Sequence, residues 1–190
     1  IDAYMEQVVT RHISGRLKVA PEHTSDETLK VMRKPSFKHF HNFKKKYDDL
    51  NKKHGLNQEL IPYFISSTPN CKEEDMANLA AETKDMGFRL EQVQDFTPTP
   101  MTVATVIYYS GYHPYTMKEM FTAKTEKEKK SQHMFFFWHK KEYRKKIKEN
   151  LVSKGREDLV ERLLFSDSSQ NKKSPKNKRS NFRSKRIKKY

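Results

Sequence analysis

Three groups of polar side chains occupy equivalent places in the first hundred residues, each beside the end of a short apolar run. They are Glu22 and His23 after the first run, Ser66 and Ser67 at the end of the second, and Gln92, Gln94 and Thr99 around the end of the third, where the aromatic Phe96 accompanies them. A carboxylate, hydroxyls and amides placed together can orient a polar ligand by hydrogen bonds. The groups form one site only if the three runs are strands of one sheet.

The runs, residues 16–20, 59–66 and 90–94, are each followed by a proline-marked polar loop and, after the first two, by a clear helical pattern. That order is typical of consecutive βα units, whose parallel strands end at a common edge where ligands bind. The sequence therefore predicts an α/β fold with three parallel strands. Three units do not close a barrel, so we expect a piece of a longer protein. Pro62 lies inside the second run, although proline prefers an edge or the start of a strand.

Apolar spacing predicts helices over residues 2–13, from Thr24 or Ser25 to Pro35, over 36–54 and over 72–86. Residues 101–109 fit either a short helix or a strand, because they are rich in β-branched and aromatic side chains. We expect domain boundaries at 1–124 for the βα units, 125–165 for a helical appendage and 166–190 for a disordered tail.

Charge and cysteine content limit the function classes. Residues 166–190 hold ten Lys/Arg and one acid, a net +9 of the overall +15, which leaves +6 on residues 1–165. No run reaches the ~20 apolar residues of a membrane span, so no membrane partner is expected. Cys71 is the one cysteine, so this chain has no internal disulfide and cannot supply the three or four ligands of a zinc ribbon or an iron–sulfur cluster. We expect a cytoplasmic protein and no metal held by this chain.

The chain resembles the YgiQ family of radical S-adenosylmethionine (SAM) proteins over residues 1–165. Three segments carry the resemblance: LKVAPEHTSDETLKVMRK at 17–34, LIPYFISSTP at 60–69 and LEQVQDFTPTPMT at 90–102. The same segments resemble, more distantly, the barrel of the radical SAM methylthiotransferases. One departure is that Thr68 and Asn70 stand where the family usually has His and Gly.

The resemblance implies a fold and a reaction. The fold is the C-terminal half of a partial (β/α) barrel, in which this chain supplies the fourth to sixth strands. The intact enzyme would carry a four-iron four-sulfur cluster on a three-cysteine loop that this chain does not contain. There the reduced cluster would cleave SAM, and the resulting radical would abstract hydrogen from an unknown substrate. We expect the chain to position SAM, to be inactive alone, to need the missing N-terminal half as partner, and to self-associate through an open strand edge.

The resemblance also assigns roles to residues. Glu22 would bind the SAM ribose, and either Lys34 or Arg33 its carboxylate. The positions of the remaining candidates at the strand ends predict their roles. Ser66 and Ser67 would let a ligand approach the backbone, and Gln92 and Gln94 would face the barrel interior. Phe96 would offer its backbone or ring to the adenine, and His23 and Thr99 would face substrate. Simpler alternatives are solvated loop residues, cations at a helix C-terminus, and amides that satisfy each other.

The alternative function is a nucleic-acid- or ribosome-associated module without enzymatic activity, acting through the basic tail. Ten cations in twenty-five residues bind polyanions at low salt whatever the sequence. The candidates are Lys172, Lys173, Lys176, Lys178, Arg179, Arg183, Lys185, Arg186, Lys188 and Lys189.

Overall fold

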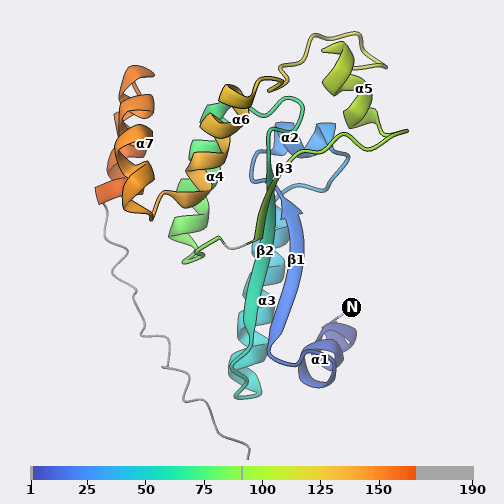
Figure 1. Ribbon diagram of the computed structural model, residues 1–190. Coiled ribbons are helices and arrows are strands. Elements are labelled where there is room, and N and C mark those ends of the chain that lie inside the picture. Colours follow the sequence, from blue (N-terminus) through green and yellow to red (C-terminus); the bar gives the residue numbers. More distant parts are fainter. Residues whose placement is uncertain (1, 91, 166–190) are drawn as a thin grey trace, which may run out of the picture.

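A computed structural model describes residues 2–90 and 92–165 and shows one parallel sheet of three strands (Figure 1). The strands are β1 (Arg16–Glu22), β2 (Glu59–Ser66) and β3 (Gln92–Asp95), in the order β1-β2-β3. The prediction of a mixed α/β fold with three parallel strands is confirmed. The ten tail cations proposed to bind polyanions lie outside the described residues.

Pro62 sits in the central strand, yet its missing N–H disrupts little. It pairs in register with Val19 of β1, whereas the pairing of β2 with β3 starts only at Tyr63, opposite Gln92. At Pro62 the strand therefore has a described neighbour on one side only. This geometry gives proline the edge-like position that it prefers.

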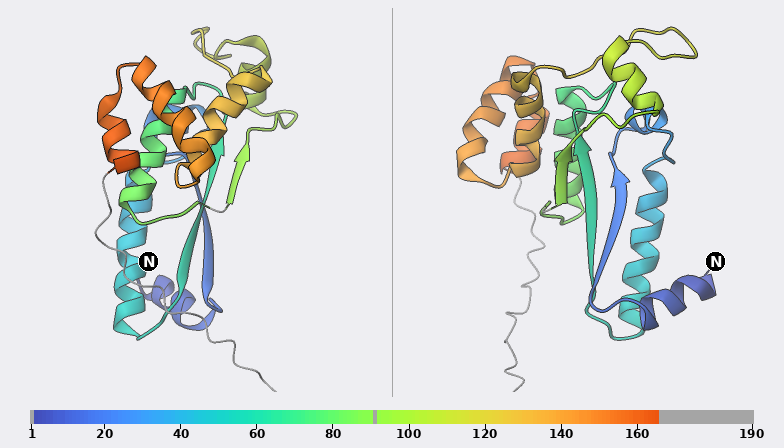
Figure 2. Two further views of the ribbon diagram at one scale, coloured as in Figure 1. Left: turned by 60° about the vertical axis from the view of Figure 1, so that its left-hand side comes forward. Right: turned by 45° about the vertical axis from the view of Figure 1, so that its right-hand side comes forward.

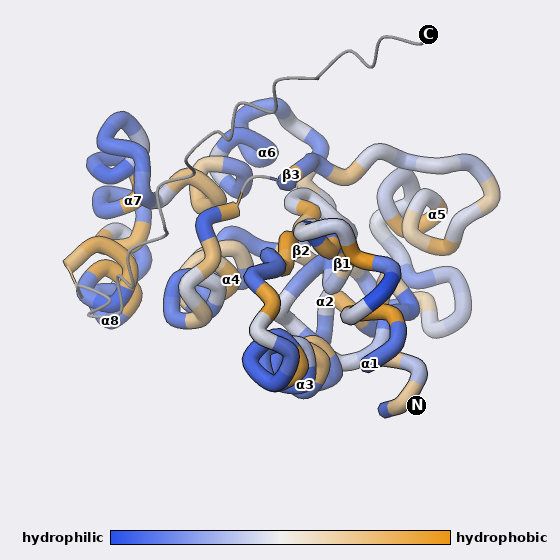
Figure 3. Tube along the Cα trace, turned by 90° about the horizontal axis from the view of Figure 1, so that it is seen from below, coloured by the Kyte–Doolittle hydropathy of each residue, from blue (hydrophilic) through white to orange (hydrophobic). Residues whose placement is uncertain are grey.

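The crossover helices of the βα units lie on one side of the sheet (Figure 3). They are α2 (Asp26–Val31), α3 (Lys38–Lys53) and α4 (Glu73–Asp85). Ser25 caps α2, because its hydroxyl accepts the Thr28 N–H at 3.5 Å. Acidic residues fill the first turn of α4, where they face the positive end of the helix dipole.

The two faces of the sheet differ in character. Phe64 and Val93 pair in register and belong to the apolar core on the helix side. Tyr63 and Gln92 also pair in register, and the alternation of the strands places them on the opposite face. Lys18 lies there too, exposed, with its ammonium 5.8 Å from the Tyr63 ring. Ile61 and Ile65 share this face with Tyr63, so it is mixed polar and apolar. A parallel sheet normally has both faces covered, so its partial exposure is unusual for the fold class.

Residues 101–109, for which the sequence left helix and strand open, form α5 (Val103–Ser110). The Thr102 hydroxyl accepts the Thr105 N–H at 3.2 Å and so caps the helix. Gly111 ends it with φ 77°, a left-handed conformation in which glycine meets no steric penalty. The two caps decide in favour of a helix, in spite of the β-branched content.

The remaining described elements are helical, as the apolar spacing predicted. They are α1 (Asp2–Arg11), which packs on α3, and then α6 (Glu126–His133), η1 (Met134–Phe137), α7 (Lys141–Ser153), α8 (Glu157–Val160) and η2 (Glu161–Phe165). None of the helices in 2–90 or 92–165 combines the length and apolar character needed to cross a membrane.

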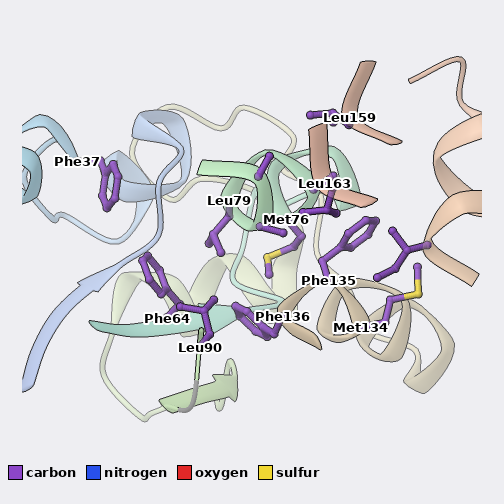
Figure 4. Close-up of a cluster of buried hydrophobic side chains, with 14 of the residues drawn as sticks. Phe37, Phe64, Met76, Leu79, Leu90, Met134, Phe135, Phe136, Leu159 and Leu163 are labelled. Carbon is purple, nitrogen blue, oxygen red and sulfur yellow. The ribbon is translucent and has the colours of Figure 1, made fainter. Parts of the chain in front are cut away.

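Helix α4 lies between the sheet and the C-terminal helices (Figure 2). It is apolar on both sides, so it packs against both neighbours. Figure 4 shows the resulting cluster running from Phe64 of β2 through Met76 and Leu79 of α4 to Phe135 and Leu163. One continuous core therefore joins the βα units to the helices after residue 125, and the boundary between 124 and 125 stays a prediction.

Candidate functional site

The carboxyl ends of β1 and β2 carry unusual backbone conformations. Glu22 ends β1 with φ 69°, and Ser67 follows β2 with φ 62°. Left-handed backbone is uncommon for residues other than glycine and costs about 1–3 kcal/mol at each position. Such residues persist where surrounding contacts hold them, and they concentrate at functional sites. Two of them at neighbouring strand ends mark this edge of the sheet as a candidate site.

Glu22 is paired with one of the two candidate cations. Its carboxylate accepts a hydrogen bond from the Lys34 ammonium at 3.2 Å, and its side chain is only 15% exposed. Arg33, one residue earlier, also has a left-handed backbone and places its guanidinium 5.4 Å from the centre of the Tyr115 ring. The structure therefore joins Lys34 to Glu22 and turns Arg33 toward a different loop.

Ser66 and the end of β3 form a second polar group. The Ser66 hydroxyl donates to Oδ1 of Asp95, its partner in register, and the Ser66 carbonyl accepts the Phe96 N–H at 2.8 Å. Nδ1 of His133 lies 2.9 Å from the same Asp95 oxygen. Neither Asp95 nor His133 is among the site residues expected from the sequence. The position of Asp95 directly after Gln94, at the end of the third apolar run, could have marked it as a candidate. Nothing in the sequence links it to a histidine 38 residues later.

Helix α6 is fastened to the end of β2. The Ser67 N–H donates to Oε1 of Gln132 at 2.8 Å, and Nε2 of Gln132 donates to the Cys71 carbonyl at 2.8 Å. The Gln132 side chain is buried and spans the gap between the two backbones. The Ser67 hydroxyl is buried and has no hydrogen-bond partner among the described residues.

His23, which was expected to face substrate, does not reach the surface of the described part of the chain. The side chain is fully buried: its Nδ1 accepts the Ser25 N–H at 2.9 Å, and its Nε2 lies 3.4 Å from Sγ of Cys71. Burial lowers the pKa of His23 to about 4, so the ring is neutral near pH 7. His23 is a structural residue that supports the loop after β1. Burial likewise raises the pKa of the Cys71 thiol.

The other candidates lie farther apart. Thr99 is exposed, and its carbonyl accepts the hydroxyls of Thr102 and Thr105 at 3.0 and 2.6 Å, which shapes the start of α5. Gln94 is exposed on the face of the sheet that carries Tyr63, so the alternative of buried, mutually satisfied amides does not apply to it.

The Phe96 ring packs against Tyr108 in a tilted arrangement with ring centres 5.6 Å apart, which fixes it beside the end of β3. The structure thus brings Glu22 and Lys34 together, and Ser66 and Phe96 together, with Gln92 and Gln94 on the adjoining face. In the described part of the chain, no three His, Cys, Asp or Glu side chains gather as a metal site would require.

Comparison with known proteins gives consistent matches. Residues 91–186 match a family described as a domain of unknown function, DUF3362. A UPF0313 protein of Bacteroides thetaiotaomicron is 60% identical over 160 residues, which is 84% of this chain and 26% of that protein. A UPF0313 protein of Porphyromonas gingivalis is 57% identical over 163 residues, 86% of this chain and 26% of that protein.

More distant organisms carry the same segment. A UPF0313 protein of Methanocella arvoryzae is 41% identical over 159 residues, 84% of this chain and 26% of that protein. The chain therefore spans about a quarter of the length of these curated relatives. No solved structure matches the chain.

Proposed function

The chain belongs to the UPF0313 family, which is the YgiQ family, and on that premise we propose that it is the C-terminal portion of a cytoplasmic radical SAM enzyme. It would supply three strands of a partial (β/α) barrel, with residues 1–124 as the barrel piece and 125–165 as a helical appendage. Two observations support the barrel: the strands are parallel, and one face of the sheet carries polar as well as apolar side chains and is partly exposed. In a closed barrel that face lines the interior.

The residues at the sheet edge fit SAM. SAM presents ribose hydroxyls, a carboxylate and an ammonium group, which call for a carboxylate and a cation on the protein. Glu22 and Lys34 supply both at one strand end, 3.2 Å apart. We assign Lys34 to the SAM carboxylate ahead of Arg33, because Arg33 points toward Tyr115. When bound, SAM supplies the adenosyl group for radical chemistry.

The iron–sulfur cluster does not fit this chain. A four-iron four-sulfur cluster needs several thiolates, and the sequence contains only Cys71. That thiol is fully buried beside His23, and burial raises its pKa, so it favours the neutral form that does not bind iron. We place the cluster, and therefore the electron-transfer half of the enzyme, in the remainder of the longer protein.

The work of this chain is then binding and orientation. Glu22 would hold the ribose of SAM and Lys34 its carboxylate. Ser66 and Ser67 would present their backbone to the ligand at the end of β2. Phe96 would contact the adenine through its ring or its backbone. Gln92, Gln94 and Thr99 remain available for substrate or cofactor contacts. The observation that carries this proposal is the left-handed Glu22, held at the end of β1 with a cation already paired to it.

The test uses the full-length protein, purified without oxygen, reconstituted with iron and sulfide, and reduced with dithionite. We expect 5′-deoxyadenosine to form from SAM, and Glu22→Ala to reduce its rate at least tenfold with an unchanged iron content. Glu27→Ala is the matched control, since Glu27 is an exposed acid on α2 paired only with Lys30 among the described residues. Equal rates in both variants would remove Glu22 from the site, and no product with a full cluster would count against radical SAM cleavage.

A further inference from the structure

A cavity of about 600 Å³ opens beside the carboxyl end of β3, between that strand and helices α6 and α7. Its wall includes Asp95, Lys127, Lys130, His133, Tyr143 and Lys146. The lining residues at 127, 130 and 131 of α6, and at 134 where η1 begins, recur at the three- and four-residue spacing that puts side chains on one helix face. The proposed SAM residues Glu22 and Lys34 do not line it.

The cavity is strongly basic. Lys130 pairs with exposed Glu126, but neither Lys127 nor Lys146 has a carboxylate within 4 Å among the described residues. Residues 126–154, which form α6, η1 and α7, hold ten Lys/Arg and four Asp/Glu, a net +6. That equals the net charge of residues 1–165 as a whole. Unpaired ammonium groups in a concave wall attract anions from solution.

The cavity also has an oriented imidazole and an aromatic wall. Asp95 holds Nδ1 of His133 at 2.9 Å, which fixes the ring and leaves Nε2 for another partner. Tyr143 packs against Phe137 with ring centres 5.8 Å apart, so its orientation is supported from behind. A fixed aromatic ring between cations is the arrangement on which single-stranded nucleic acids stack their bases.

We propose that this cavity binds one nucleotide of a single-stranded nucleic acid, with its phosphate on Lys127 and Lys146 and its base against Tyr143. A volume of about 600 Å³ is far larger than a phosphate ion needs and lies in the range of small-molecule pockets. A concave wall with an aromatic ring fits an unstacked base better than a flat lipid surface. This site lies in the body of the chain and is separate from the basic tail. The proposal that this site binds a nucleotide does not depend on whether the protein cleaves SAM.

The test measures binding of a fluorescein-labelled twelve-nucleotide oligouridylate to the full chain by anisotropy, across a salt series. We expect the Lys127→Ala/Lys146→Ala variant to bind at least tenfold more weakly at 150 mM salt. The magnitude of its slope of log affinity against log salt should fall by about 0.7, because the single phosphate held by Lys127 and Lys146 is no longer neutralised. The matched control is Lys45→Ala/Lys52→Ala, which removes two exposed α3 lysines of the same charge. Equal weakening in both variants would show that net charge alone is read, and would overturn the site.

Two further experiments identify the class of ligand. The Tyr143→Leu variant retains apolar packing on Phe137, so its urea unfolding midpoint should not change. It should bind the oligonucleotide at least fivefold more weakly, and wild-type affinity would overturn the stacking role. Uridine monophosphate should displace the oligonucleotide at concentrations where inorganic phosphate, at equal ionic strength, does not; equal displacement would reduce the site to a phosphate site. The same variants are also tested for binding to phosphatidylglycerol vesicles. If they lose as much affinity for the vesicles as for the oligonucleotide, the surface binds anionic membranes and the proposal is overturned.

Discussion

Glu73, in the first turn of α4, joins that helix to the C-terminal helices through one carboxylate. Ser131 of α6 and Lys154, just after α7, donate to it, and Nδ2 of Asn150 donates at 3.0 Å. Partial burial alone would raise the pKa of Glu73, but the hydrogen bonds from Lys154, Ser131 and Asn150 outweigh it and hold the pKa below its usual 4.5. Replacing the carboxylate should therefore loosen the docking of these helices on α4.

The Glu73→Gln variant conserves shape and removes the charge. A hydrogen bond to a charged group contributes about 1.5–3 kcal/mol, and the glutamine amide offers one oxygen acceptor where the carboxylate offers two. Because Lys154 is 35% exposed, its ion pair adds less than a buried one. We expect a loss of about 2–4 kcal/mol in the free energy of unfolding at pH 7.

Urea unfolding followed by circular dichroism measures this loss at pH 7 and at lower pH. Since the folded pKa lies below 4.5, the carboxylate stabilises the fold above pH 4.5, and the contribution fades as pH falls through the folded pKa. The difference between wild type and Glu73→Gln should therefore shrink below pH 4.5. Glu74→Gln is the control, an exposed acid in the same helical turn. Equal stability of the two variants at pH 7 would refute the docking role.

Three further predictions concern the core and the sheet edges. Burial holds the pKa of His23 near 4, against 6.5 in the unfolded chain, so stability should fall by up to about 3 kcal/mol as pH drops from 6.5 to 4. His23→Gln should flatten that part of a pH-dependent unfolding curve, and an unchanged slope would contradict it. The buried Lys84 ammonium donates to the carbonyls of Arg162 and Leu163 at 2.8 and 3.1 Å and so ties α4 to the C-terminal helical segment. Lys84→Met should lower the free energy of unfolding in urea by about 2–4 kcal/mol, and wild-type stability would exclude this stabilising role. The outer edges of β1 and β3 have no partner strand among the described residues, so the isolated chain should self-associate in sedimentation at high concentration, and a monomer throughout would argue against open edges.

Local sequence patterns predicted the elements well because each rests on short-range physics. The three apolar runs became parallel strands, and Ser25, one of the two expected caps, marks the start of α2. β3 is shorter than expected, since Leu90 packs in the core before the strand begins at Gln92. Residues 101–109 were ambiguous because their side chains favour a strand while their caps favour a helix.

The site was predicted less completely because its contacts are long-range. Strand-end position alone placed both Glu22 and His23 at the mouth, yet the left-handed turn at Glu22 directs the next side chain into the core. The contacts of Asp95 with His133, and of Ser67 with Gln132, join residues 38 and 65 positions apart. No local period encodes such pairs; they arise only when α6 packs on the sheet.

The most direct test of the central claim is a structure of the full-length protein with SAM bound. The account predicts SAM at the carboxyl ends of β1 and β2, with its ribose on the Glu22 carboxylate and its own carboxylate on Lys34. SAM bound elsewhere, with this edge of the sheet closed off by other segments of the protein, would contradict it.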